Sequence, residues 1–428
     1  MKTNRRQPQK SIFLNLSLFQ FLSFVRRGVF YTFMINYLFD LMRTVTSTTL
    51  LGTLNMMASA LGQNLLWGKI ADRYKLRTKL IIIGESIAAT TYLVVFFIHK
   101  SLLNVQAHFA SGLSLIFGLS FLEFFWSMSD VGWAALLTDV TTNKTRGSVV
   151  GALNFIAALG RMIGIIFAGV LYNNGEGFRQ GIIFYIVVAM LLASATIMGI
   201  ASKTIKTLPI KTQKPISNNA DAETPMNHKA QVYKWFLISL IIIIVGATCT
   251  NQVFLLFLKL PQGLNASDPQ MSLILTAWTV GGMLISLFSG WLADRIGRAK
   301  VFFTGLLLAI VTPLLYSVAL DVYVMAFVYG LNGIAFWTIQ TVGFAFAGDI
   351  IAEDRRGRLF SRYNTVMALS WGPSGLLVGG PLSDVQTKNF GQPPFTAYVN
   401  TFYASSIITA VGAIIFVFKV LKHETKNV

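Results

Sequence analysis

The chain has 428 residues, of which 54% are hydrophobic and 12% are charged, and its mean hydropathy is +0.61. These values lie far outside the range of soluble domains of this length, so they exclude a soluble globular fold. The formal net charge of +18 could suggest a nucleic-acid partner, but the positions of the basic residues argue otherwise. Cys249 is the single cysteine and the 4 His residues are scattered, which excludes a disulfide framework and a zinc-ligand pattern.

Long apolar runs divide the chain from end to end. Crossing a hydrocarbon core of roughly 30 Å takes about 20 apolar residues in a helix. Runs of this length lie between charged or turn-rich breaks, at residues 14–40, 44–67, 79–99, 107–138, 147–173, 179–202, 235–260, 270–291, 300–319, 322–348, 359–384 and 396–420. The sequence therefore predicts an all-α integral membrane protein with twelve transmembrane helices.

The basic residues are distributed unequally between the two sides of this predicted membrane protein. Most of the 35 Lys and Arg residues fall in the two termini and in the loops on the same side. The opposite side holds Arg43, Lys100, Arg179, Lys259 and Lys388. Because cytoplasmic loops carry an excess of positive charge, both termini are predicted to be cytoplasmic in a multi-pass protein of the cell (inner or plasma) membrane. The positive charge then reflects topology, and no nucleic-acid partner is expected.

A polar segment and a repeated spacing divide the chain into two halves. Residues 201–234 are rich in Lys, Pro, Ser and Asn and cannot bury enough apolar surface to fold alone. We expect residues 1–200 and 235–428 to form two six-helix bundles joined by this cytoplasmic linker. The fourth and tenth spans are followed by the same pattern, Asp139 with Arg146-Gly147 and Asp349 with Arg356-Gly357.

A charged turn also occurs once in each half. The two copies read Gly68-Lys-Ile-Ala-Asp72-Arg73-Tyr-Lys-Leu-Arg77 and Gly290-Trp-Leu-Ala-Asp294-Arg295-Ile-Gly297-Arg298. The pattern resembles the major facilitator superfamily of secondary transporters, whose loop between the second and third helices of each half reads G-x-x-x-D-R-x-G-R-R. The second copy fits well, and the first departs at Lys75 and Leu76. The resemblance implies two parallel six-helix repeats with a substrate site near the membrane midplane between them.

The resemblance further implies that the charged turns are a conformational latch. In this family they hold the cytoplasmic ends of the two halves together in the outward-open state. An acid and an arginine can do so by pairing with each other or with the charged ends of neighbouring helices. The alternative is that these residues only mark topology and form turns. The residues assigned to the latch are Gly68, Asp72, Arg73, Asp139, Arg146, Gly290, Asp294, Arg295, Asp349 and Arg356.

Ionisable residues interrupt the apolar runs of the N-terminal half. An unpaired charge at the bilayer centre costs roughly 2.5–3.5 kcal/mol, so these side chains must face partners or water. Glu123 and Asp130 share one helix face with Ser127, and two carboxylates close together in a low-dielectric site are suited to carry a proton. We therefore expect Glu123 and Asp130 to couple transport to protons. Internal ion pairs that only stabilise the bundle are the alternative for the full set, which is Arg26, Arg27, Glu85, Glu123, Asp130 and Arg161.

The arginines are candidates for binding substrate. Arg27 lies on the polar face of the first span with Tyr31 and is expected to face a central cavity, whereas Arg26 is expected to pair with an acid on a neighbouring helix. Arg161 could meet the acids of the fourth span or a substrate anion. Glu85 lies less than two turns beyond the basic turn, so we expect it to pair with a local Lys or Arg.

The C-terminal half supplies uncharged candidates that could orient an organic ligand near the midplane. Ordinary helix packing is the alternative for each of them. They are Thr248, Asn251, Gln252, Trp278, Asn332, Trp337, Gln340, Asn364 and Trp371. The residues predicted to bind substrate are Arg27, Tyr31, Arg161, Asn251, Trp337, Gln340 and Trp371.

The fifth span departs from the pattern of exporters in the superfamily. Those proteins often carry Gly-Pro-x-x-Gly there, whereas this chain has Gly160-Arg161-Met-Ile-Gly164 without the proline. The small residues permit close helix contact. A Gly372-Pro373-Ser-Gly375 segment occupies the equivalent place in the other half. The departure weakens an assignment to drug:proton antiport, although not to transport.

These observations favour a secondary active transporter that moves a small organic solute by alternating access and is coupled to protons. Export of amphiphilic compounds is preferred because the helices are apolar and rich in aromatic residues. One alternative is transport of an anionic metabolite or chelate by Arg27 and Arg161, and another is a non-transporting receptor with a transporter fold. No enzyme activity, cofactor or metal is expected, because no catalytic set, metal cluster or phosphate loop is found. The expected partners are a small-molecule substrate, protons and the lipid bilayer, with the protein as a monomer.

Overall fold

The computed structural model describes residues 6–74, 76–141, 146–205, 227–350 and 356–421, and the regular elements within these ranges are helices. We use "N-terminal half" for the elements up to residue 205. It contains α1 (Arg6–Tyr31), α2 (Met34–Met42), α3 (Val45–Leu61), η1 (Gly62–Trp67), α4 (Gly68–Tyr74), α5 (Arg77–Asn104), α6 (His108–Val140), α7 (Arg146–Leu171), η2 (Asn173–Gly175), α8 (Glu176–Arg179) and α9 (Ile182–Ile205).

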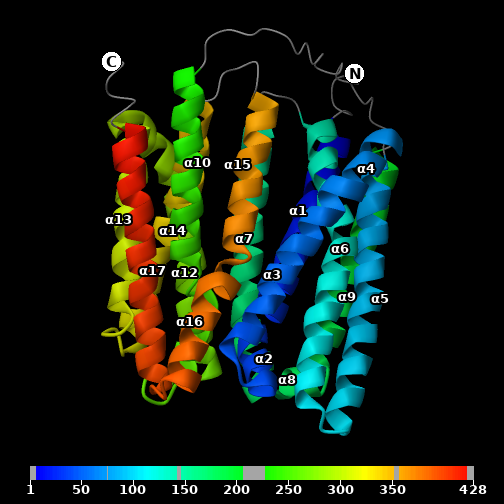
Figure 1. Cartoon of the computed structure of the whole chain (residues 1–428). Helices are drawn as coiled ribbons and strands as arrows, with labels where there is room; N and C mark the ends of the chain where they lie inside the picture. Colours follow the sequence, from blue (N-terminus) through cyan, green and yellow to red (C-terminus); the bar gives the residue numbers. More distant parts are fainter. Residues whose placement is uncertain (1–5, 75, 142–145, 206–226, 351–355, 422–428) are drawn as a thin grey trace.

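The "C-terminal half" begins at residue 227. It contains α10 (Asn227–Thr248), α11 (Asn251–Lys259), α12 (Asp268–Ile296), α13 (Arg298–Leu315), α14 (Val322–Ile350), α15 (Arg356–Trp371), η4 (Gly375–Gly379), α16 (Gly380–Asp384), η5 (Val385–Asn389), α17 (Pro394–Phe416) and η6 (Val417–Leu421). Figure 1 shows the two halves as bundles that stand side by side, with the long helices roughly parallel. The end at which α1 begins and α17 ends is called the terminal side here, and the opposite end is the far side.

Each predicted span corresponds to one passage of the chain between these two sides, which confirms the twelve-helix arrangement. Within the described ranges, eight helices are long and apolar enough to cross a membrane unbroken, or up to nine if a pair bent by 47° is one span. The other passages combine shorter elements, for example α1 with α2 and α3 with η1 and α4. Single π-helical turns such as η1 and η4 are frequent at functional sites of helical proteins.

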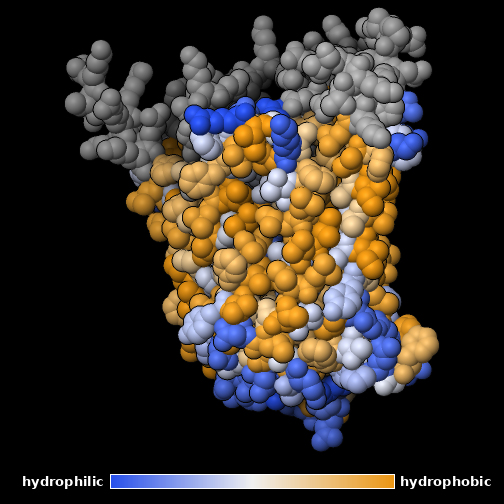
Figure 2. Space-filling model, turned by 90° about the vertical axis from the view of Figure 1, so that its left-hand side faces the viewer, coloured by the Kyte–Doolittle hydropathy of each residue, from blue (hydrophilic) through white to orange (hydrophobic). Residues whose placement is uncertain are grey.

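An apolar band surrounds the middle of the protein. Figure 2 shows it on the face of the C-terminal half, between hydrophilic residues at the two ends. Large side chains on several helices contribute to such bands, including Phe117 at 59% exposed, Phe327 at 68% and Ile407 at 65%. A soluble protein rarely leaves so much contiguous apolar surface in water, so this band is the surface that meets lipid.

Aromatic clusters fill the interior of each half. Phe30 of α1 makes edge-to-face contacts with Tyr92, Phe178 and Phe184, at ring distances of 4.7, 5.5 and 5.2 Å. In the C-terminal half, the ring of Phe302 lies 6.4 Å from that of Phe346 and 4.8 Å from that of Phe416. These ring contacts lie within the halves, whereas a larger hydrophobic core extends from the N-terminal half to α11 and α17 of the C-terminal half.

Glycines allow α7 to pack closely against α1. A Cβ atom on Gly28 would lie 2.6 Å from the carbonyl oxygen of Arg161, and one on Gly160 would lie 2.6 Å from that of Phe21. Gly164 approaches the carbonyl of Val25 closely as well. The expectation that the small residues of this span permit close contact is therefore confirmed, and it fixes α7 beside α1.

We predict that Gly164→Leu lowers the stability of the protein. A larger side chain must push α7 away from α1, and such overpacking costs about 1–3 kcal/mol. Gly151→Leu on the same helix is the matched control, because a Cβ atom there has nothing within 4 Å. In detergent, thermal unfolding should occur at a clearly lower Tm for Gly164→Leu alone. Equal Tm values for the two variants would show that α1 and α7 can separate without cost.

Candidate functional site

An ion pair lies near the middle of the N-terminal half. Arg27 Nη2 on α1 is 3.7 Å from Asp130 Oδ1 on α6, and the two side chains are 34% and 39% exposed. The Arg27 guanidinium also lies 4.3 Å from the centre of the Trp126 ring. Both charged groups thus remain accessible within the membrane-spanning passages, as a site that binds and releases a ligand requires.

Glu123 and Tyr31 belong to the same cluster. Glu123 lies two turns before Asp130 on α6, and the charges acting on it are those of Arg27, Asp130 and Arg26. The buried hydroxyl of Tyr31 interacts with that of Tyr92, and Glu123 also acts on it electrostatically. The structure therefore brings together four of the residues predicted from the sequence.

Arg26 is enclosed behind this cluster and is only 2% exposed. Its Nη1 donates a hydrogen bond of 3.4 Å to the hydroxyl of Tyr92, and its guanidinium lies 4.6 Å from the centre of the Trp126 ring. The expected partner was an acid on a neighbouring helix. Within the described ranges Arg26 forms no direct ion pair, although Glu85 acts on it electrostatically.

The prediction for Glu85 is wrong. Its carboxylate does not reach the basic turn but is completely buried between α5 and α6. Glu85 Oε1 accepts hydrogen bonds of 2.8 Å from Trp126 Nε1 and from Ser129 Oγ. The nearest acting positive charge is that of Arg26. The error arises because the sequence does not show how α5 is rotated about its own axis. In the structure this rotation points Glu85 toward α6.

Arg161 lies where the two halves meet. It extends from α7, and its guanidinium is 5.5 Å from the centre of the Trp278 ring on α12. Trp278 is held in place within the C-terminal half, because its Nε1 donates to Asn332 Oδ1 at 3.2 Å and Asn332 Nδ2 donates to Thr312 Oγ1 at 3.0 Å. The contact therefore joins a cation of one half to a ring of the other half that is held by hydrogen bonds.

Aromatic rings continue from Trp278 along the C-terminal half. Phe336 lies 5.6 Å from Trp278 and 5.6 Å from Trp371, and Trp337 lies 6.1 Å from both Trp278 and Phe336. Trp337 is 37% exposed. We call these four residues the aromatic wall. Two of its members were predicted to bind substrate, and Trp278, which contacts Arg161 directly, was only a general candidate.

The remaining uncharged candidates are less clearly placed. Gln340 lies one turn after Trp337 on α14 and is half-buried, and Asn251 is the half-buried first residue of α11. No hydrogen bond joins either side chain to the rest of the described chain. Thr248 donates to Ile244 O at 2.7 Å and to Ser374 Oγ at 2.9 Å, so packing accounts for it.

The two halves are joined firmly on the far side. Asp384 at the end of α16 accepts hydrogen bonds from the backbone amides of Val45 at 3.0 Å and Thr46 at 2.8 Å, which open α3 in the other half. A carboxylate at a helix N-terminus satisfies free amides and interacts favourably with the helix dipole. The contact thus ties α16 to α3.

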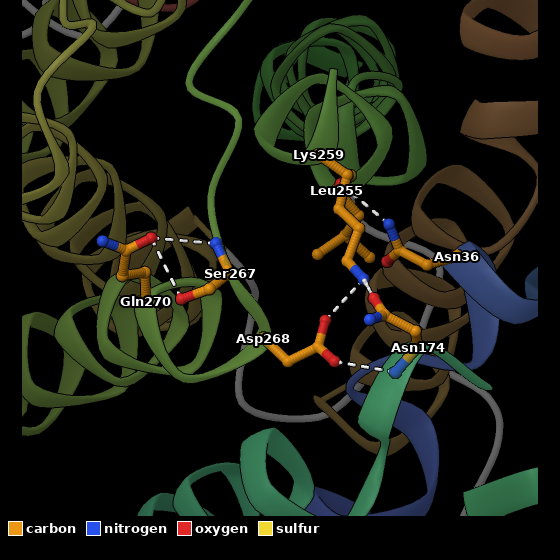
Figure 3. Close-up of polar contacts among 7 residues, drawn as sticks. All are labelled: Asn36, Asn174, Leu255, Lys259, Ser267, Asp268 and Gln270. Carbon is orange, nitrogen blue, oxygen red and sulfur yellow. Dashed lines mark hydrogen bonds and ion pairs between the residues drawn. The ribbon is translucent and has the colours of Figure 1, made fainter. Parts of the chain in front are cut away.

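A second polar cluster closes the same side (Figure 3). Lys259 at the end of α11 pairs with Asp268 at the start of α12, and both residues bind Asn174 of the N-terminal half. Asn36 of α2 donates to Leu255 O of α11 at 3.1 Å. Among the described residues, the hydrogen bonds between halves extend from here only as far as Thr53, which donates to Gly372 O at 3.3 Å. We call Asp384 and the contacts of Lys259 the far-side closure.

Sequence reasoning missed the far-side closure. Its signal was present, because Lys259, Asp268 and Asp384 are charged residues at the far-side ends of apolar spans. Lys259 is interpreted from the sequence only as a mark of topology, and the two acids are assigned no role. Nothing in their spacing shows that they meet across the halves, since the contact joins positions hundreds of residues apart.

On the terminal side, the charged turns form contacts inside each half. Arg77 Nε is 3.0 Å from Asp139 Oδ2 on α6, and Arg77 Nη1 donates to Ala71 O at 2.5 Å. In the second copy, Arg298 Nη2 is 3.6 Å from Asp294 Oδ1, and Arg298 Nη1 donates to Ala345 O at 3.3 Å. The last arginine of each motif makes these contacts, although neither was among the predicted latch residues.

The other predicted latch residues have simpler surroundings. Arg73 and Arg295 are exposed and lie over the rings of Tyr74 and Trp291, at 5.5 and 4.5 Å. Gly68 begins α4, and nothing lies within 4 Å of a Cβ atom on Gly290. Gly297 has a φ of 100°, which favours glycine, and the corresponding Lys75 lies outside the described residues. The side chains of Asp72, Arg146, Asp349 and Arg356 lie outside the described part as well.

The chain resembles known transporters in sequence over limited stretches. It is 27% identical over 111 residues to the multidrug resistance protein MdtL of Citrobacter koseri, which is 26% of this chain and 28% of that protein. It is 21% identical over 136 residues to MdtL of Vibrio parahaemolyticus, or 32% and 34% of the two chains. The chain therefore matches about a third or less of the length of these relatives.

Solved structures share the fold over almost the whole chain. The nucleoside transporter NupG has a TM-score of 0.64 at 16% identity, covering 95% of this chain and 100% of that one. A bacterial homologue of the iron transporter ferroportin in an inward-facing state has a TM-score of 0.67 at 13% identity, covering 97% and 99%. The family model of the Major Facilitator Superfamily matches residues 16–264 and 236–428. With the repeated turns and the two six-helix halves, these matches show that the chain belongs to the Major Facilitator Superfamily of membrane transporters.

Proposed function

We propose that this protein is a proton-coupled secondary active transporter that moves a small amphiphilic organic solute by alternating access. The observation that carries the proposal is the Arg27–Asp130 ion pair, which is accessible near the middle of the membrane-spanning part. Ionisable groups at such a position are costly and commonly serve ion or substrate pathways. The aromatic wall on the facing half supplies apolar surface for the solute.

The distribution of basic residues supports an orientation with the terminal side in the cytoplasm. The far side is then external, and the far-side closure makes the observed shape an inward-facing one. Residues 1–200 and 235–428 are the two bodies that would rock against each other, with residues 201–234 as the cytoplasmic linker. The alternating state must break the contacts of Asp384 and Lys259 and bring the terminal sides together.

Coupling follows from the charges around Arg27. When Asp130 takes up a proton, it loses its negative charge and Arg27 loses its paired anion. Glu123 is then the remaining carboxylate acting on Arg27. Proton binding thereby changes the net charge that a solute meets at the site, and solute binding changes the affinity of the carboxylates for protons. This reciprocal effect is what drives one flux with the other.

Export is the direction we infer for this flux. The apolar and aromatic lining suits amphiphiles, and the relatives found over part of the chain are named multidrug resistance proteins. An exporter must bind its solute from the cytoplasmic side, which in the proposed orientation is the side opposite the far-side closure. When the halves rock, the solute would leave on the external side in exchange for a proton that enters from that side.

We predict that Asp130→Asn and Glu123→Gln uncouple transport. A solute identified by thermal shift of the purified protein at two pH values would be used in proteoliposomes. Each variant should lose accumulation driven by a pH gradient, because a carboxylate that binds the proton is gone, but should retain exchange of solute at equal pH. Glu176→Gln is the control, because it removes a carboxylate that is 42% exposed on a far-side loop. Full gradient-driven accumulation in both site variants would refute the assignment.

A second prediction concerns the far-side closure. Asp384→Asn should shift the population toward the state open on the far side, because the charge at the N-terminus of α3 is lost. The effect should be on the order of fivefold, given about 1 kcal/mol for such a cap. Spin labels at Lys100 and Val318, which are exposed on the far sides of the two halves, would report the distance between them.

Asp321→Asn is the matched control for this measurement. Asp321 also accepts two backbone amide hydrogen bonds, from Tyr323 and Val324, but it does so within its own half. An equal change of distance in both variants would mean that the loss of a helix cap, and not the link between halves, is responsible.

A third prediction tests the latch on the terminal side. Arg77→Gln should lower the population in which the terminal sides are closed, because the turn loses the contacts that hold α4, α5 and α6 together. Spin labels at the exposed Lys203 and Lys300 would measure the separation. Lys69→Gln, an exposed position on α4, is the control. No change in the Arg77 variant would leave the turn with a purely topological role.

A further inference from the structure

The arginines near the middle of the protein differ in whether a negative or polar group lies close enough to compensate their positive charge. Arg27 has Asp130 at 3.7 Å, and Arg26 has the hydroxyl of Tyr92 and the charge of Glu85. Arg161 has neither. In the described part of the chain, no carboxylate lies in an ion pair with it, and the groups acting on it electrostatically are Tyr329 and the like charge of Arg27.

Packing keeps Arg161 in this uncompensated position. The backbone of α7 is held to α1 by Gly28 and Gly164, and to α12 by the close approach of Gly169 to Ser272. The side chain is half-buried, so it is neither sealed in a core nor freely hydrated. A guanidinium carries five N–H donors in one plane. None of those of Arg161 has a hydrogen-bond acceptor among the described residues.

The guanidinium of Arg161 lies over an aromatic ring. Its central carbon is 5.5 Å from the centre of the Trp278 ring, and its N–H groups can donate to a planar acceptor such as a carboxylate. The rest of the aromatic wall continues from Trp278 through Phe336 to Trp337 and Trp371. An anion bound at Arg161 would therefore have aromatic surface beside it.

The local charges point the same way. Arg27 and Arg26 have acids among the groups near them, whereas the groups acting on Arg161 are Tyr329 and the like charge of Arg27. An anion bound at Arg161 would therefore compensate this charge, whereas a cation would be repelled by it.

We infer that the solute is an organic anion with an aromatic ring, bound through its carboxylate to Arg161 and through its ring to Trp278 and the aromatic wall. The inference rests on the proposed transport function and adds the charge and the shape of the solute. It assigns Arg161 and Trp278 as residues that determine specificity from opposite halves.

Binding of matched probes to the purified protein tests the inference. The probes are 2-naphthoate as the anion, 2-naphthylmethylammonium as the cation, and the pair benzoate and cyclohexanecarboxylate, which differ in the aromatic ring. Thermal shift and equilibrium dialysis at pH 7 would give affinities. We expect the anion to bind more tightly than the cation, and benzoate more tightly than cyclohexanecarboxylate. Arg161→Gln should weaken 2-naphthoate on the order of tenfold or more, as for loss of a charged hydrogen bond.

Variants separate this role from a structural one. Arg161→Lys, which keeps the charge, should retain part of the affinity for 2-naphthoate, and Trp278→Ala should reduce the preference for benzoate. Lys388→Gln removes an exposed far-side cation and should change nothing. Tighter binding of the cation, unchanged anion affinity in Arg161→Gln, or no anion binding by the unaltered protein would overturn the inference. None of these results touches proton coupling, which is judged by the gradient experiment with Asp130→Asn.

Discussion

The structure depends on one constraint, which is that a hydrocarbon environment does not tolerate an uncompensated charge. Two adjacent arginines on α1 satisfy this constraint with different partners. Arg26 turns inward to Tyr92 and the buried Glu85, whereas Arg27 turns to Asp130 and remains accessible. The inner arginine helps to hold the bundle together, and the outer one can exchange its partner. A protein that must bind and release a charged species needs both kinds of site side by side.

Much of the fold could be predicted from the sequence because hydrophobicity and charge act along single segments. The length of the apolar runs gives the passages, and the repeated turns at Gly68 and Gly290 give the equivalence of the halves. The helical spacing of Glu123 and Asp130 predicts that the two acids share one face of their helix, and in the structure Arg27 lies near both of them. The rotation of α5 about its axis could not be predicted, which is why Glu85 was assigned to the wrong partner. The contacts between the halves could not be predicted either, because they depend on how the two folded bundles pack against each other.

The far side and the terminal side of the molecule are stabilised by different kinds of interaction. On the far side, Asp384 uses a helix dipole and two backbone amides of the other half, so the contact does not require a particular side chain on α3. On the terminal side, Arg77 and Arg298 connect elements within their own halves. The first kind of contact joins the two halves, whereas the second joins elements within one half. The proposed alternation would therefore break different kinds of interaction at its two ends.

The place of Arg161 on α7 has a mechanical consequence. In a pair of bodies that rock about a central axis, the ends swing through large arcs while points near the pivot hardly move. The contact of Arg161 with Trp278 joins α7 to α12 across the two halves, so it would lie close to such a pivot if the halves rock as proposed. A solute held there would keep the same neighbours in both orientations, so its intrinsic affinity would be nearly equal on the two sides. The proton gradient, and not a difference in affinity between the two orientations, would then drive the proposed export.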